Sequence, residues 1–315
     1  MNIVLLEPLG VPEEVLNLCV KPLLEGGHTF RSYPKSTDPQ VQIDRAKDAD
    51  VIMIANMPLT GEVIAACPNL KLIDVAFTGV DHVDLEAARA KGVKVSNAAG
   101  YSNQAVAELT LCMMLSLLRN VPQVEARCRT GGTKDGLVGS ELQGKTVGIV
   151  GTGAIGQRTA ALCRAFGCKV LGYRRHLKGD EPGFIEYVPL EELLSRSDIV
   201  SLHCPLNDSS RNLINRDTIA RMKDGVIILN NSRGPLVVEQ DLADALNSGK
   251  VYAAGLDVVS TEPIRGDNPL LKAKNCIITP HISWAPKESR QRIMDATVRN
   301  VRAWMDGAPI NVVNQ

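Results

Sequence analysis

The sequence has no net charge and no long uninterrupted hydrophobic run, and we expect no secretory leader. Its 35 basic residues balance 35 acidic ones without a long basic run, which argues against nucleic acid or an anionic membrane surface as a partner. The amino-terminal stretch lacks the charged segment and small-residue cleavage site of a signal peptide. The most apolar long segment, 105–118, contains Glu108 and is too short to cross a bilayer. The sequence therefore predicts a soluble, cytoplasmic protein.

Paired cysteines and clustered histidines are also missing. The eight cysteines are scattered, contain no CxxC pair and mostly fall within apolar segments. Buried free thiols in a reducing compartment are therefore favoured over a disulfide framework or a zinc site. The five histidines are too dispersed to indicate a metal, so no metal is expected.

At 315 residues the chain is long for one domain and comfortable for two. Short β-branched runs alternate with helical patterns, which predicts parallel sheets covered by helices and hence an α/β fold. Five strands are expected near the amino terminus, at 3–6, 28–33, 51–54, 71–76 and 94–96. Six more are expected further along, at 147–150, 169–173, 199–203, 226–230, 251–257 and 276–279.

Two long helices organise the predicted domains. One runs from residue 103 to about 119 and is apolar on most of its circumference, so it should be buried on several sides. The other, 288–304, is long enough to return toward the amino-terminal domain. We therefore expect a Rossmann-type, doubly wound cofactor domain, residues 99–286. It is inserted into a smaller, split, flavodoxin-like α/β domain formed by residues 1–98 and 287–315.

Residues 146–165 carry the strongest local signal, a β-branched strand followed by GxGxxG and a helical pattern. The first glycine permits a tight turn, the second lets the backbone approach a pyrophosphate, and the third allows close packing of helix on strand. Free amides at the helix start then meet the phosphates. In this context the motif predicts dinucleotide binding rather than a solvent-facing glycine loop. The predicted contacts are Gly151, Gly153, Ala154, Ile155 and Gly156.

The second strand of this domain ends without the acidic residue that binds the ribose 2′-hydroxyl of NAD. Arg174 and Arg175 stand there instead. A guanidinium grips a 2′-phosphate through its charge and its fork of donors. NADP(H) is therefore predicted to be favoured, with NAD(H) not excluded. The alternative is that both arginines point into solvent.

Three further loops follow strands of the same domain, and they carry Arg233, Glu262 and His281. Singly, each residue has an ordinary explanation as a surface charge, a loop acid or a turn residue. Together, at the edge that bears the glycine turn, they make an acid/base site with an anion clamp.

Two loops of the amino-terminal domain also follow strands, where parallel sheets place ligands. One contains Met57, a candidate substrate contact. The other contains Thr78, Gly79 and Val80, whose amides could form a concave anion site for a carboxylate. An ordinary glycine turn explains the second loop equally well.

The motifs GTGAIG, NNSRG, DVVSTEP and TPHISW, in this order and spacing, resemble those of the D-isomer-specific 2-hydroxyacid dehydrogenases over nearly the whole chain. The resemblance implies that Arg233 binds substrate, His281 is the acid/base and Glu262 is its partner. It implies that the amides of residues 78–80 bind the substrate carboxylate, and that the protein is a homodimer. The cofactor site is expected to include Pro205, Asn231, Ser232, Asp257 and Ser283.

The chemistry of the three side chains agrees with these roles. Reduction of a 2-keto acid needs a hydride at the carbonyl carbon and a proton at its oxygen. His281 can donate the proton near neutral pH, and Glu262 would favour its imidazolium form. Arg233 can hold the carboxylate and polarise the carbonyl, while a nicotinamide supplies the hydride.

The TPHISW ending resembles the glycerate dehydrogenase and hydroxypyruvate reductase branch, which implies hydroxypyruvate or glyoxylate as the 2-keto acid. Trp284 would then wall the substrate pocket, unless it packs in a core or interface. A phosphoglycerate-type or broad-range 2-ketoacid reductase stays open, although no extra basic cluster for a phosphate is evident. So does a nucleotide-sensing interaction protein, because the C-terminal-binding transcriptional corepressors resemble the same triad.

Overall fold

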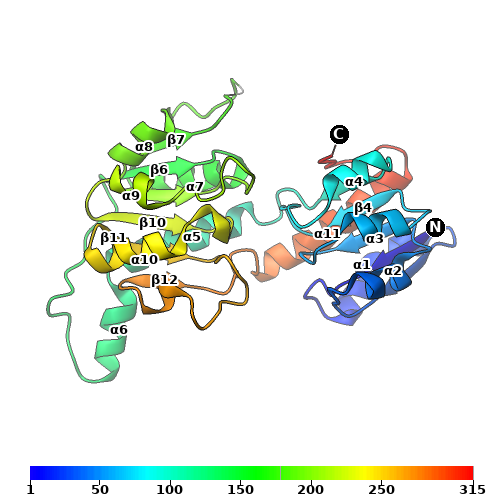
Figure 1. Ribbon diagram of the computed structural model, residues 1–315, viewed down its shortest axis with the longest axis horizontal. Coiled ribbons are helices and arrows are strands. Elements are labelled where there is room, and N and C mark those ends of the chain that lie inside the picture. Colours follow the sequence, from blue (N-terminus) through cyan, green and yellow to red (C-terminus); the bar gives the residue numbers. More distant parts are fainter. Residues whose placement is uncertain (178, 315) are drawn as a thin grey trace. The chain divides into compact units, whose positions relative to one another are not determined.

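The computed structural model describes residues 1–177 and 179–314, and Figure 1 shows their course. The chain forms two compact units. The split unit contains Met1–Tyr101 and the segment from Ala285 onward, and the inserted unit contains Ser102–Trp284. The boundaries expected from the sequence, after residues 98 and 286, lie a few residues from these positions.

The split unit is built on one parallel sheet. Two interior strands, β3 and β4, are buried at every residue, as short apolar runs predict for a sheet covered on both faces. The strand order is that of flavodoxin-like folds, which confirms the fold class expected for this unit. The strands are β1 (Asn2–Leu5), β2 (Thr29–Ser32), β3 (Val51–Ile54), β4 (Leu72–Val75) and β5 (Lys94–Asn97), in the order β2-β1-β3-β4-β5.

Five helices belong to this unit: α1 (Glu13–Leu24), α2 (Pro39–Ala46), α3 (Gly61–Ala66), α4 (Leu85–Ala90) and α11 (Lys287–Met305). The last of these packs against α1, β4 and β5. Asn300 of α11 donates from Nδ2 to Asp74 Oδ1 and to the Asn97 carbonyl oxygen, both at 2.9 Å. These buried hydrogen bonds attach the last helix to the sheet.

The inserted unit contains a doubly wound sheet in which every neighbouring pair is parallel. The strand order reverses at β6, whose carboxyl end is therefore the switch point where such sheets bind ligands. The prediction of six strands was one short, because β8 has two residues and shows no alternation. The strands are β6 (Thr146–Val150), β7 (Lys169–Tyr173), β8 (Glu186–Tyr187), β9 (Ile199–Leu202), β10 (Val226–Asn230), β11 (Val251–Leu256) and β12 (Cys276–Ile278), in the order β12-β11-β10-β9-β6-β7-β8.

The remaining helices and 3-10 turns are α5 (Asn103–Leu118), α6 (Val121–Arg129), α7 (Ala154–Ala165), α8 (Leu190–Arg196), α9 (Arg216–Ala220), η1 (Gly234–Leu236), α10 (Glu239–Ser248) and η2 (Pro269–Lys272). α5 packs against α7, β10 and β11, as its apolar circumference predicts. α6 has no buried residue and extends away from the sheet (Figure 1).

The helices α5 and α6 also carry two thiols that differ from expectation. Cys67 and Cys163 are buried, but Cys112 on α5 and Cys128 on α6 are exposed, so the prediction of buried thiols was wrong for these two.

Within the described residues, no single helix has the length and apolarity needed to span a membrane. Only α5 and α6 taken together pass that test, and they are bent by 62°.

Candidate active site

The turn after β6 brings the amino end of α7 to the switch point of the inserted sheet. Gly151 has a φ of 96°, and a Cβ there would lie 2.6 Å from the Cys204 amide nitrogen. A Cβ on Gly156 would lie 2.1 Å from the Gly151 carbonyl oxygen, whereas one on Gly153 would meet nothing within 4 Å. The turn is thus closed toward the protein and open at Gly153, where α7 begins without a side-chain cap. Free amides in such a turn suit a phosphate; they belong to Ala154, Ile155 and Gly156.

Arg174 and Arg175 directly follow β7, whose last residue is hydrogen-bonded to the glycine turn at 2.9 Å. The Arg174 side chain is 20% exposed, and its Nη1 lies 3.7 Å from Glu181 Oε1. Arg175 is exposed and donates to Ser209 Oγ. The end of β7 therefore carries two guanidiniums, a hydroxyl and one carboxylate. Neither Glu181 nor Ser209 was predicted, because both lie in loops remote in sequence from the glycine motif.

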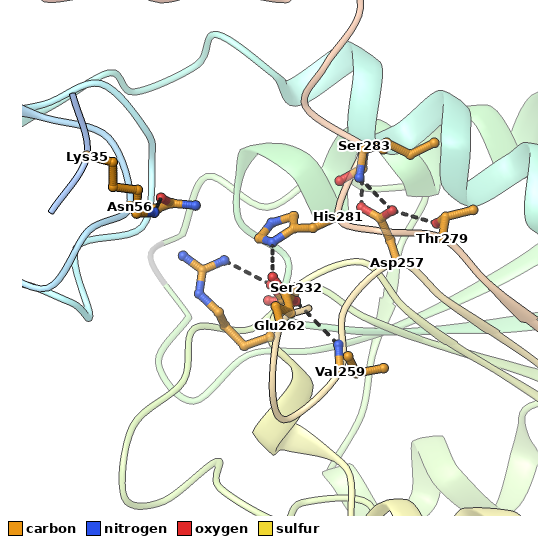
Figure 2. Close-up of polar contacts among 11 residues, drawn as sticks. Lys35, Asn56, Ser232, Asp257, Val259, Glu262, Thr279, His281 and Ser283 are labelled. Carbon is orange, nitrogen blue, oxygen red and sulfur yellow. Dashed lines mark hydrogen bonds and ion pairs between the residues drawn. The ribbon is translucent and has the colours of Figure 1, made fainter. Parts of the chain in front are cut away.

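The loops after β11 and β12 bring Glu262 and His281 together (Figure 2). His281 Nδ1 lies 2.8 Å from Glu262 Oε2, and the two side chains are 32% and 38% exposed. The Val259 amide donates to the other carboxylate oxygen at 3.3 Å. Since Nδ1 is occupied by the glutamate, Nε2 is the ring nitrogen that can face a ligand. The pair can therefore hold a proton and still reach solvent.

The surroundings of the Glu262 carboxyl group lower its pKa and so favour its charged form. Burial acts to raise its pKa, but the hydrogen bond and charge of His281 oppose burial. The Val259 amide and the positive charge of Arg233 act in the same direction as His281, and the net result is a pKa below the usual range. A charged carboxylate therefore lies beside the imidazole.

The His281 backbone is held in an uncommon conformation, with a φ of 53°. Its amide donates to the carbonyl oxygens of Asp257 at 2.8 Å and Thr279 at 3.0 Å. The fully buried Asp257 carboxylate accepts hydrogen bonds from Thr279 Oγ1 at 2.6 Å and from the amides of Ile282 and Ser283, both at 2.8 Å. Asp257, expected at the cofactor site, thus holds the histidine loop in place (Figure 2). Such surroundings sustain a strained backbone.

Arg233 lies in the loop after β10, and its Nη1 donates to the Ser232 carbonyl oxygen at 2.9 Å. The Asn230 side chain, 1% exposed, spans the loop: Nδ2 donates to the Arg233 carbonyl oxygen at 2.8 Å and Oδ1 accepts from the Ser232 amide at 3.1 Å. A Cβ on Gly234 would lie 2.0 Å from the carbonyl carbon of Val259. Only glycine lets the arginine loop approach the segment that carries the glutamate.

Among the buried polar atoms near this edge, Asn231 Oδ1 and Thr152 Oγ1 have no partner within the described residues. Leaving such atoms unpaired is costly. A bound dinucleotide that pairs with them would remove this cost, so the residues present fit the cofactor that the sequence predicts. The other predicted residues are placed as follows: Ser283 is buried, Ser232 and Trp284 are half-buried, and Pro205 is exposed.

His203 directly follows β9, beside the glycine turn, and was missed by the sequence analysis. A ring nitrogen, Nε2, lies 2.8 Å from Ser201 Oγ, while Nδ1 is buried without a partner in the described part of the chain. Burial lowers the pKa of His203 to about 4, so its ring is neutral at pH 7. Its place directly after a buried strand was the signal that could have found it.

In the split unit, the loop after β4 presents backbone amides. Within the described residues, the amides of Thr78, Gly79 and Val80 donate to no protein acceptor. The Thr78 carbonyl oxygen accepts from Asn97 Nδ2 at 2.7 Å, which fixes the loop to the end of β5. Three unpaired amides in a fixed loop suit a carboxylate.

Met57 is placed differently from expectation. Its side chain is fully buried in the core of the split unit, and its amide donates to Glu7 Oε1 at 2.7 Å. This placement argues against Met57 as a substrate contact. Asn56 and Pro58 are the exposed residues of the same loop, and Asn56 Oδ1 accepts from Lys35 Nζ at 2.9 Å.

Known proteins resemble the chain across both units. A family model for the D-isomer specific 2-hydroxyacid dehydrogenase, NAD binding domain, matches residues 111–283. The hydroxypyruvate reductase of Blautia hydrogenotrophica is 49% identical over 287 residues, 89% of each chain. That of Thermotoga maritima is 41% identical over 250 residues, 78% of this chain and 81% of the relative. Among solved structures, an acyclic imino acid reductase in complex with NADPH and D-Arg has a TM-score of 0.91 at 28% identity, covering 99% of this chain and 100% of that one.

Proposed function

The chain belongs to the D-isomer specific 2-hydroxyacid dehydrogenase family, and from this premise we propose that it reduces a small 2-keto acid to a D-2-hydroxy acid with NAD(P)H. Hydroxypyruvate and glyoxylate are the proposed substrates, which makes the enzyme a hydroxypyruvate/glyoxylate reductase, or glycerate dehydrogenase. The observation that carries the proposal is the 2.8 Å pair of His281 and Glu262 in loops at the carboxyl edge of the inserted sheet.

The proton is the part of the reaction that the chain's own residues handle. A bound reduced nicotinamide supplies the hydride to the carbonyl carbon. His281, cationic and held by Glu262 through Nδ1, donates the proton from Nε2 to the carbonyl oxygen. Arg233 polarises the carbonyl and stabilises the negative charge that develops on its oxygen. The amides of Thr78, Gly79 and Val80 bind the carboxylate, and Trp284 walls the substrate pocket.

The proposed cofactor residues are those of the glycine turn and the neighbouring strand ends. Gly151, Gly153 and the first amides of α7 hold the pyrophosphate. Arg174, Arg175 and the Ser209 hydroxyl favour a 2′-phosphate, and hence NADP(H) over NAD(H). Pro205, Asn231, Ser232, Asp257 and Ser283 line the rest of the site.

We propose a homodimer in which α5 and α6 meet a second copy. In the single chain α6 buries none of its residues, and its Val121 is 49% exposed. Val138, in the loop that follows α6, is 84% exposed. Exposed apolar side chains on a helix that buries none of its own residues favour an interface. Light scattering should give twice the chain mass of 34.0 kDa, and a monomer would contradict the assignment.

A substrate panel with both reduced cofactors tests the proposed function. Glyoxylate, hydroxypyruvate, pyruvate and 3-phosphohydroxypyruvate are each offered with NADPH and with NADH, and cofactor oxidation is followed. The highest kcat/KM is expected for hydroxypyruvate or glyoxylate with NADPH. A clear preference for the phosphorylated acid would favour a phosphoglycerate-type enzyme. Tight cofactor binding without turnover would favour a nucleotide-sensing interaction protein.

A further inference from the structure

The carboxyl edge of the split sheet carries a polar cluster that the proposed reaction leaves unused. Glu7 follows β1, Lys35 follows β2 and Asn56 follows β3, and these strands are neighbours in the order β2-β1-β3. Lys35 Nζ donates to Asn56 Oδ1 at 2.9 Å (Figure 2) and lies 3.4 Å from Glu7 Oε2. Three strand ends thus contribute to one group of contacts.

A buried carboxylate holds the cluster in place. The Glu7 side chain is 3% exposed, and its Oε2 faces Lys35. Its Oε1 accepts the amides of Ala55 at 2.8 Å and Met57 at 2.7 Å. Because those amides flank Asn56, Glu7 fixes the backbone of the asparagine and the position of the lysine at once.

Helix α2 fixes the lysine segment independently. Gln42, 1% exposed, donates from Nε2 to the carbonyl oxygens of Ser36 at 2.9 Å and Pro58 at 3.2 Å, which ties the loops after β2 and β3 to each other. Arg45 donates from Nη1 to the Pro34 carbonyl oxygen at 2.7 Å. Lys35 is therefore held on both sides although its own side chain is 48% exposed.

The charges of the cluster decide which ligand it suits. An ammonium group has three hydrogens, and those of Lys35 reach Glu7 and Asn56 while leaving one donor direction open within the described part of the chain. Since Asn56 accepts through Oδ1, its amide group is left to donate. The lysine charge is balanced by Glu7, so the cluster offers donors without net charge. It suits a neutral hydroxyl better than a phosphate dianion.

The sheet order relates this cluster to the loop proposed to bind the carboxylate. β3, which precedes Asn56, lies directly beside β4, which precedes Thr78–Val80. Neighbouring strands are about 4.8 Å apart. A substituent on the far carbon of a three-carbon keto acid bound by the 78–80 amides is therefore within reach of Asn56 and Lys35.

We propose, on the premise of the function proposed above, that Lys35 and Asn56 bind the C3 hydroxyl group of the 2-keto acid and that Glu7 positions them. The subsite makes hydroxypyruvate a better substrate than glyoxylate, which has no third carbon. It also disfavours 3-phosphohydroxypyruvate, because Glu7 already balances the charge of Lys35.

The ratio of kcat/KM for hydroxypyruvate to kcat/KM for glyoxylate tests this assignment. Lys35→Met is expected to lower the ratio about tenfold or more, since a hydrogen bond from a charged donor is lost. The double variant Glu7→Gln/Lys35→Met should lower it similarly without leaving a buried carboxylate unpaired. Lys47→Met serves as the matched control, because Lys47 is exposed at the opposite end of α2.

The outcomes separate the subsite from the reaction itself. A lower ratio in both Lys35 variants but not in Lys47→Met supports the subsite. An unchanged ratio in folded Lys35 variants overturns the subsite but not the proposed reductase function. A wild type that reduces glyoxylate but not hydroxypyruvate has the same meaning. A wild type that reduces neither acid with either cofactor overturns the proposed function and the subsite with it.

Discussion

The two sheets present their carboxyl edges with different chemistry. The inserted unit offers reactive side chains, a histidine and a glutamate 2.8 Å apart together with an arginine whose charge acts on that glutamate. The split unit offers backbone amides and a lysine whose charge is balanced by Glu7. Under the proposed function, the inserted unit supplies the reacting side chains and the split unit supplies the donors that bind the substrate.

Buried aspartates show the same contrast. Asp257 in the inserted unit accepts three hydrogen bonds from the histidine loop. Asp74, on β4 of the split unit, accepts one from Asn300, and its Oδ2 has no partner among the described residues. Burial, only partly offset by that hydrogen bond, raises the pKa of Asp74 to about 8. One carboxylate organises a reactive loop, whereas the other is a protonated group inside a sheet.

The largest effect is expected from His281→Ala. Removing the proton donor should lower kcat by at least about 100-fold. The Kd for the reduced cofactor should stay close to that of the wild type, because the glycine turn is untouched. Stopped-flow turnover and a fluorescence titration with NADPH measure the two quantities. Near-normal turnover would exclude the proposed role, and His28→Ala in the split unit serves as control.

Glu262→Gln should have the next largest effect. Glutamine keeps an oxygen near Nδ1 but removes the negative charge beside the imidazole, so kcat is expected to fall about 10- to 100-fold. Steady-state kinetics at a fixed pH measures kcat. An unchanged kcat would exclude Glu262 from the acid/base system.

Arg174→Asp should change the choice of cofactor. The ratio of kcat/KM for NADPH to kcat/KM for NADH is expected to fall about tenfold. Glu181→Gln should move the same ratio a few-fold the other way, since Glu181 lies 3.7 Å from Arg174 and competes with a 2′-phosphate for it. Steady-state kinetics with both cofactors measures the ratio. A native preference for NADH, insensitive to Arg174, would refute the NADP assignment.

Asp74→Asn should have the smallest effect and should act on stability rather than turnover. An aspartate in the unfolded chain titrates near 4, whereas Asp74 in the folded protein titrates near 8. The folded state therefore holds a proton that the unfolded state has lost. This contribution is full at low pH and is lost as pH rises toward 8. The free energy of unfolding of the wild type should fall by about 1 kcal/mol between pH 6 and pH 7 relative to the variant.

Urea unfolding at pH 6, 7 and 8 measures the Asp74 contribution, with the exposed Asp48→Asn as control. Parallel pH dependences of wild type and Asp74→Asn would contradict it. A large fall in kcat for Asp74→Asn would mean that the split unit also takes part in the chemical step, which would contradict the contrast between the two sheets.

Much of this arrangement follows from the sequence, because it depends on local patterns. Runs of β-branched residues predict the buried parallel strands, and GTGAIG between a strand and a helix predicts the glycine turn. The placement of Arg233, Glu262 and His281 at one edge follows from their positions after strands of one parallel sheet. The short strand β8 and the solvent-exposed helix α6 were missed, since neither carries the periodicity that burial imposes.

The details that depend on tertiary contact could not be predicted. Nothing local marks Asp74 as buried, since a single acid in a short strand is equally compatible with a solvated face. The core position of Met57 and the exposure of Asn56 depend on Glu7, a residue 50 positions from Met57 along the chain. Likewise, the contact between Arg174 and Glu181 depends on how the loop after β7 returns to the strand.

The most direct test of the central claim is the product formed by the wild-type protein from hydroxypyruvate and NADPH. Chiral chromatography of the product, with NADPH oxidation followed in the same sample, measures stereochemistry and stoichiometry together. We expect D-glycerate, one molecule for each NADPH oxidised. Formation of L-glycerate, or no consumption of hydroxypyruvate with either NADPH or NADH, would contradict the assignment of His281, Glu262 and Arg233 to the reduction of a 2-keto acid.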